Sequence, residues 1–181
     1  AKAVPYGAVT IYTDETGSRA VIDGNYDGME SAIIPENIKV SSVTFERNFP
    51  KGKYSTIFLP FSIPQTKVEG GVFHEFAYVD LEKMQVAFRS SLAKSGGIIE
   101  ANTPYIFEAT DNQLTFNLEG EDFVTLEPSA EAVARSVSPE APYEEDGKWE
   151  FRGVYSYKQW QEGDAELGAA YGFAAASNPE A

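Results

Sequence analysis

The chain has 181 residues, no cysteine and a formal net charge of −14, from 28 acidic and 14 basic side chains. Hydrophobic residues make up 43% of it and aromatic residues 13%, which predicts a folded domain rather than a disordered chain. The negative charge repels phosphate groups and anionic lipids, so we expect neither nucleic acid nor a membrane surface as a partner. The lack of cysteine excludes disulfides, thiol catalysis and cysteine-ligated metals. No stretch approaches the roughly 20 apolar residues of a transmembrane helix.

The N-terminal residues predict a β-hairpin followed by a tight polar loop. Two apolar segments rich in β-branched residues, 8–13 and 19–22, flank a turn-rich connector at 14–18. Connectors of this kind close antiparallel strands. The sequence DGNYDG at 23–28 follows directly and consists mainly of residues that favour turns.

A longer strand and the densest apolar run come next. Within residues 38–49, Val43, Phe45 and Phe49 fall on one face of a strand with a period of two. The opposite face carries Thr44, Glu46 and Asn48. Residues 54–64 (YSTIFLPFSIP) predict a strand that is buried on both faces and ended by its prolines.

The remaining strand candidates recur at regular intervals. Residues 72–80 and 84–89 are expected to form a pair of strands joined around residues 81–83. The other candidates are residues 98–99, 105–110, 113–118, 149–157 and 171–174. About ten strands with little helix predict an all-β fold, either an antiparallel β-sandwich of jelly-roll type or a partly open barrel. No change in composition divides the chain, so we expect a single module over residues 1–181, in which residues 1–37 are able to form a small hairpin lobe.

Four motifs stand out between residues 47 and 175. They are RNFPKGKYSTIFLPF at 47–61, ANTPYIF at 101–107, WEFRGVYSYKQW at 149–160 and YGFAA at 171–175. In this order and spacing they resemble a β-rich module of secreted and surface proteins from fibre-degrading bacteria of the Bacteroidota–Fibrobacterota type. Because the motifs are structural in character, the resemblance implies a shared fold, export and an accessory role beside adhesive and carbohydrate-active neighbours.

One predicted strand near the C-terminal end suggests a carbohydrate-binding face. The residues that project to one side of it are Trp149, Phe151, Tyr155 and Tyr157, and Trp160 follows. Exposed aromatic rings stack on the C–H faces of sugar rings. Charged residues occupy the other side of the strand, which favours core positions for Trp149 and Phe151. Tyr155, Tyr157 and Trp160 are therefore the predicted ligand-binding residues.

The DGNYDG loop also matches the first half of a calcium-binding loop. Asp23, Asn25 and Asp27 supply oxygens at its first, third and fifth positions, and a glycine follows. Ile34 stands where the bidentate carboxylate of such a loop is expected. The alternative is a turn in which these residues serve only the backbone conformation. Calcium is the one cofactor that the sequence suggests.

No catalytic motif stands out, so we do not expect an enzyme. His74 is the one histidine of the chain, and its strand brings no partner for a triad or a zinc site. Two of the 28 acidic residues would suffice for glycoside hydrolysis, but nothing in the sequence marks a pair. We expect His74 to be a structural or surface residue.

Two functional hypotheses follow. The first is a non-catalytic attachment module, secreted or displayed on the cell surface, that binds polysaccharide through exposed aromatic residues. The second is a structural subunit or spacer of a bacterial surface appendage or adhesin, whose partner is another copy of the chain. The exposed strand edges of an all-β chain favour the second hypothesis, as does the end of the sequence at Ala181, soon after the last predicted strand.

Overall fold

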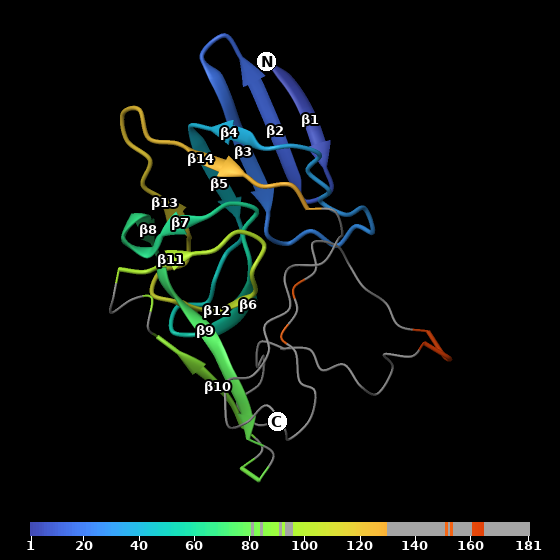
Figure 1. Ribbon diagram of the computed structural model, residues 1–181, viewed down its shortest axis with the longest axis vertical. Coiled ribbons are helices and arrows are strands. Elements are labelled where there is room, and N and C mark those ends of the chain that lie inside the picture. The colour runs from blue at the N-terminus through green and yellow to red at the C-terminus, as the bar shows by residue number, and fades with distance from the viewer. Residues whose placement is uncertain are drawn as a thin grey trace.

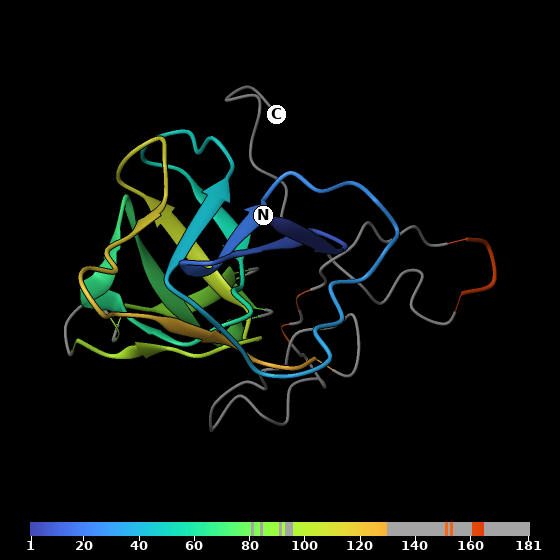
Figure 2. The same cartoon turned by 90° about the horizontal axis from the view of Figure 1, so that it is seen from above.

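The computed structural model describes residues 1–80, 82–83, 85–90, 92, 96–129, 151, 153 and 161–164. Within these residues the chain forms two four-stranded sheets and three two-stranded ladders. Figure 1 shows the N-terminal sheet at one end of the molecule and the long strand β9 extending toward the other end. Seen from above, the strands lie around a common interior (Figure 2).

The N-terminal sheet has the strand order β1-β2-β3-β5. Its strands are β1 (Lys2–Tyr6), β2 (Val9–Asp14), β3 (Gly17–Asp23) and β5 (Ser42–Glu46). The antiparallel pair β2–β3 confirms the predicted hairpin, whereas β1 is an edge strand that the sequence pattern did not reveal. β3 and β5 pair in parallel, because a long connection returns the chain to the starting end of the sheet.

The second sheet has the order β10-β9-β12-β6, with every neighbouring pair antiparallel. Its strands are β10 (Gln85–Arg89), β9 (Gly71–Asp80), β12 (Tyr105–Ala109) and β6 (Tyr54–Ile57). The predicted pairing of β9 with β10 is confirmed. β9 and β12 are the two inner strands, and each is hydrogen-bonded on both sides.

Three ladders complete the described fold. They join β7 (Ile63–Pro64) to β11 (Ile98–Ile99), β8 (Val68–Glu69) to β13 (Thr115–Phe116), and β4 (Ile38–Val40) to β14 (Val124–Leu126). A short 3-10 turn, Gln65–Lys67, connects β7 to β8. The buried side-chain amide of Gln65 donates to the Gly71 carbonyl at 3.2 Å, and its oxygen accepts from the backbone amide of Phe73 at 3.0 Å. The turn is thereby fixed to the start of β9.

Residues 54–64 do not form one strand, contrary to the prediction. They contribute two separate strands, β6 and β7, with an irregular segment between them. Pro60 lies in this segment, where its missing amide proton prevents regular pairing. Tyr54 is 57% exposed, so the run begins on the surface, but Leu59 and Phe61 are fully buried. Residues 54–64 therefore contribute buried side chains to the core, although they do not form one continuous strand.

Phe107 on β12 is the centre of the aromatic packing in the core. It is fully buried, and its ring centroid lies 4.7 Å from that of Phe49 and 5.3 Å from that of Phe73. Gly71 lies against the same ring, and a Cβ atom at this position would overlap it. The core cluster around these rings also includes Val9 of the N-terminal sheet, so both sheets share one hydrophobic interior.

The ANTPYIF motif forms the turn that enters β12. Asn102 is buried with φ of 52°, a left-handed conformation that asparagine adopts more readily than most residues. The backbone amide of Asn102 donates to the Leu59 carbonyl at 2.7 Å, and the backbone amide of Ala101 donates to Ser62 Oγ at 2.9 Å. The motif therefore has a structural role, since it ties the central apolar segment to β12.

The described chain is all-β and sandwich-like, which confirms the predicted fold class. Its sheets form no closed barrel. The described residues contain fourteen strands rather than about ten, because the shortest ladder strands are too brief to show a periodic pattern. Within the same residues, no helix has the length and apolar character needed to cross a membrane.

Phe107→Ala tests the central packing. We expect it to lower the free energy of unfolding by about 3–5 kcal/mol, because the cavity would remove contacts with both neighbouring rings. The matched control is Phe123→Ala, since Phe123 is 48% exposed and its ring is covered by Lys39 Nζ at 3.6 Å. The control should cost about 1 kcal/mol or less. Equal losses in urea unfolding experiments would contradict the central role of Phe107.

Candidate ligand-binding groove

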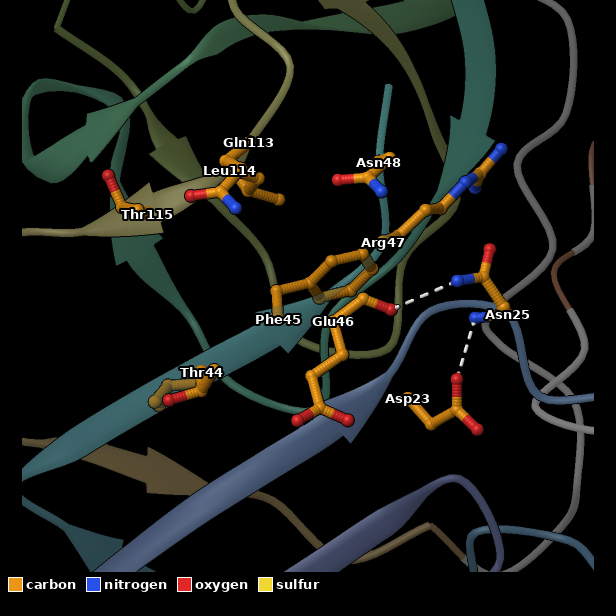
Figure 3. Close-up of a pocket in the computed structure, with 11 residues that line it drawn as sticks. Asp23, Asn25, Thr44, Phe45, Glu46, Arg47, Asn48, Gln113, Leu114 and Thr115 are labelled. Carbon is orange, nitrogen blue, oxygen red and sulfur yellow. Dashed lines mark hydrogen bonds between the residues drawn. The ribbon is translucent and has the colours of Figure 1, made fainter. Parts of the chain in front are cut away.

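A groove of about 530 Å³ lies beside β5 (Figure 3). Residues 43–48 form one wall of it. Asp23, the last residue of β3, and Asn25 in the loop after it line a second side, and residues 113–115 line a third. Three segments that are distant in the sequence therefore meet at this groove.

The alternation predicted for the β5 segment is confirmed. Val43 and Phe45 are half-buried, whereas Thr44, Glu46 and Asn48 are exposed. In the described sheet β5 is an edge strand. Its polar side chains therefore reach solvent, while Val43 and Phe45 pack against the core and stay partly exposed along the groove.

The loop after β3 is held against β5 by hydrogen bonds to one carbonyl group. The Gly24 amide donates to the Glu46 carbonyl at 3.0 Å, and Asn25 Nδ2 donates to the same oxygen at 3.4 Å. Asp23 Oδ1 accepts a hydrogen bond from the backbone amide of Asn25 at 2.9 Å, and this bond closes a tight turn (Figure 3). These bonds fix the positions of Asp23 and Asn25 beside the groove.

Gly24 permits this close approach because it has no side chain. A Cβ atom there would lie 2.5 Å from Phe45 Cε1 and 2.7 Å from Arg47 Cβ. Its φ is not in the left-handed region. Gly24 is therefore required because any side chain would overlap Phe45 and Arg47. It is not required for a left-handed backbone conformation, which is the usual reason for glycine in a turn.

The third side of the groove is positioned by the segment that follows β5. The Phe49 amide donates to the Asn112 carbonyl at 2.9 Å. This bond brings the chain into place just before Gln113, whose side chain is exposed at the groove. The approach of residues 113–115 thus depends on a contact that no local sequence pattern encodes.

An aromatic stack connects the groove to the core. The Phe45 and Phe49 rings are stacked with centroids 6.1 Å apart and an interplanar angle of 20°. The Arg47 guanidinium carbon lies 4.8 Å from the centre of the Phe49 ring, and its Nη1 donates to the Thr56 carbonyl at 3.4 Å. Burial lowers the pKa of Arg47 from its ordinary value, but arginine stays protonated in proteins. The guanidinium therefore provides a fixed positive charge near the groove, directed toward Phe49 and the Thr56 carbonyl.

The remaining lining offers both donors and acceptors. Figure 3 shows Asn48 and Gln113 on one side of the Phe45 ring and Asp23 with Asn25 on the other. Amide side chains donate and accept, and carboxylates accept. A ligand with many hydroxyl groups would find partners of both kinds around one partly exposed ring.

The predicted calcium ligands lie at or near this groove, but the structure assigns two of them other contacts. Asp23 and Asn25 take part in the turn described above, and Asp27 is exposed. Among the described residues, no group of three or more His, Cys, Asp or Glu side chains is arranged to hold a metal ion. The side-chain oxygen of Asn25 is a further possible ligand, so calcium at this loop stays a prediction.

The predicted sugar-binding residues Tyr155, Tyr157 and Trp160 lie outside the described residues, as does Trp149. Phe151 is described and is 8% exposed. Its ring lies 5.7 Å from that of Phe76 and 5.6 Å from that of Phe88. The core position expected for Phe151 is therefore confirmed.

His74 is a half-buried residue of β9, as a structural role would require. Its Nε2 lies 2.8 Å from Glu108 Oε2 on the neighbouring strand β12. The sequence pattern gave no indication of this partner, because the pairing depends on the order of strands in the sheet.

Comparisons of the chain with protein-family models, curated proteins and solved structures found no significant match. The resemblance to modules of fibre-degrading bacteria therefore stays a prediction. The arguments about function that follow rest on the geometry of the described residues.

Gly24→Ala tests how the groove is held together. The new methyl group would overlap Phe45 and Arg47, so we expect a loss of about 1–3 kcal/mol in the free energy of unfolding. Gly28→Ala is the matched control, because its methyl group would meet the ring of Tyr26, which is the end of a side chain that is able to turn aside. Urea unfolding compares the two variants. A larger loss for Gly28→Ala would contradict the role assigned to Gly24.

Proposed function

We propose that the protein is a non-catalytic attachment module, secreted or displayed on a cell surface, that binds polysaccharide in the groove beside β5. The observation that carries the proposal is the arrangement of Phe45 among amide, carboxylate and guanidinium groups around a space of about 530 Å³. Grooves of this volume fall within the usual range for small-ligand sites.

The polarity of the groove supports a sugar rather than an apolar ligand. Sites for apolar ligands are lined mainly by hydrophobic side chains, whereas Asn48, Gln113 and Glu46 here are exposed polar residues. A sugar ring has hydroxyl groups at its rim and C–H groups on its faces. The amides suit the rim, and the Phe45 ring offers an apolar contact for a face.

The charge distribution supports a neutral sugar. The chain carries a formal charge of −14, and the groove contains the carboxylates of Asp23 and Glu46. Phosphorylated or uronate-rich chains would meet repulsion from this field. Neutral cellulose, xylan and mannan chains would not.

Removal of two groove amides tests the proposal. We expect Asn48→Ala combined with Gln113→Ala to weaken binding to cellulose, xylan or mannan about tenfold, because two hydrogen bonds contribute roughly 1–3 kcal/mol together. The measurement is the dissociation constant from polysaccharide pull-downs.

The matched control is Asn37→Ala combined with Asn117→Ala, two exposed amides outside the groove. Its affinity should equal that of the unchanged protein. Equal losses in both double variants, or no retention of the unchanged protein on any of the three polysaccharides, would contradict the proposal.

The absence of catalysis is also part of the proposal and has its own test. Asp23 and Glu46 are opposite each other in the β3–β5 pair, and a pair of carboxylates is what a glycoside hydrolase uses. We expect no new reducing ends when the protein is incubated with xylan, mannan or carboxymethyl cellulose. Release of reducing ends that Glu46→Gln abolishes would instead assign hydrolysis to the groove.

A second proposal is a structural subunit that associates through strand edges. β1 is an edge strand of the N-terminal sheet and is largely exposed, which favours this alternative. Lys2 and Pro5 weigh against it, since lysine and proline on an edge discourage pairing with another chain. We therefore place polysaccharide binding first.

Light scattering coupled to size-exclusion chromatography separates these proposals. We expect a monomer, with or without a chelator, because the described edge strand β1 contains residues that discourage further pairing. A dimer or polymer that loses its association when Val4→Lys is introduced into β1 would favour the structural subunit.

A further inference from the structure

A tyrosine, a glutamate and a histidine lie close together on one face of the second sheet. Because Phe73 and Phe107 face the main core, the alternate residues of β9 and β12 project from the opposite face, where Phe76 and Ile106 are buried in a second cluster with Phe151. The register places Glu108 opposite Tyr54 of β6, and Ile106 opposite His74 of β9. Tyr54, Glu108 and His74 therefore lie next to one another on the sheet surface.

These three side chains are in mutual contact. His74 Nε2 lies 2.8 Å from Glu108 Oε2, and the His74 and Tyr54 ring centroids are 6.1 Å apart at an interplanar angle of 52°. The negative charge of Glu108 raises the pKa of Tyr54. Glu108 therefore influences Tyr54 on one neighbouring strand and contacts His74 on the other.

The cluster is accessible as well as ordered. Tyr54 is 57% exposed, and the Glu108 side chain is 37% exposed although it contacts both neighbours. The Thr56 side chain is exposed on the same strand and the same face as Tyr54. An exposed aromatic ring, a carboxylate and a hydroxyl group are thereby presented on one face of a sheet.

We propose that Tyr54, Glu108 and Thr56 form a second saccharide-binding site, in which a neutral pyranose ring stacks on Tyr54 and donates hydroxyl hydrogen bonds to Glu108. The inference rests on the proposed function for the class of ligand, but it uses none of the groove residues. His74 is a positioning residue that orients Glu108.

The charge of the cluster selects among the ligands that bind aromatic rings. Glu108 would repel phosphate, sulfate and uronate groups. An organic cation would also suit a ring beside a carboxylate, but it would make no use of the exposed Thr56 hydroxyl on the same face. A neutral ring with several hydroxyl groups uses both the aromatic face and the hydrogen-bonding positions.

The single histidine gives this site its own reporter. Since His74 is the one histidine of the chain, its ring signals in proton–carbon NMR spectra report on this cluster without assignment ambiguity. We expect cellohexaose, xylohexaose or mannohexaose to shift these signals saturably. The shift should persist in the groove variant that combines Asn48→Ala with Gln113→Ala.

Variants of Tyr54 provide the decisive comparison. Tyr54→Ala should raise the dissociation constant measured at His74 at least tenfold, whereas Tyr54→Phe, which keeps the ring, should change it less than about threefold. Tyr12→Ala is the control, because Tyr12 is a partly exposed tyrosine on the other sheet. Variants of His74 remove this reporter, so they are followed at the backbone amide signal of Glu108: His74→Ala should weaken binding at least about threefold, and His74→Gln, which keeps a hydrogen-bond donor, should restore it.

The outcomes distinguish this inference from the proposed function. If the groove variant loses all polysaccharide binding and no hexasaccharide shifts His74 in the unchanged protein, the groove binds sugar and the second site is refuted. If neither site responds to any of the three hexasaccharides, both proposals fail. A shift of the His74 signals with tetramethylammonium chloride alone would show a cation site and would also overturn the inference.

Discussion

The structure depends above all on the packing of aromatic rings around Phe107. This residue lies on one of the two inner strands of the second sheet, and its ring contacts Phe49 and Phe73 while Gly71 leaves room for it. Each such ring pair contributes about 0.5–1.5 kcal/mol beyond the burial of its area. Since Phe49 comes from the segment after β5, the same packing holds the N-terminal sheet and the second sheet on one core.

The position of the groove is a consequence of that packing. Phe45 stacks on Phe49, and the Phe49 amide bonds to the Asn112 carbonyl just before Gln113. One buried ring therefore fixes two of the three sides of the groove. The third side depends on Gly24, because only a residue without a side chain fits against β5 at this distance. A site assembled on a rigid core in this way loses little entropy when it binds a ligand.

Local patterns predicted much of the fold, and tertiary contacts account for most of what was missed. The first hairpin, the β9–β10 pair and the alternation along β5 each follow from a period of two within one segment. The groove could not be predicted from these patterns, because Gln113 reaches it only through a contact between distant segments. Tyr54 was assigned to a buried strand because the apolar density of residues 54–64 conceals the exposed outer face of β6. The Glu108 partner of His74 depends on strand order, which periodicity does not determine.

The most direct test of the central claim is a map of amide signals in nitrogen–proton NMR spectra during titration with cellohexaose, xylohexaose and mannohexaose. If the groove beside β5 binds polysaccharide, the largest shifts for at least one sugar will fall on residues 43–48, on residues 23–25 and on residues 113–115. Shifts confined to other parts of the described chain, or no shifts at saturating concentrations of all three sugars, would contradict it.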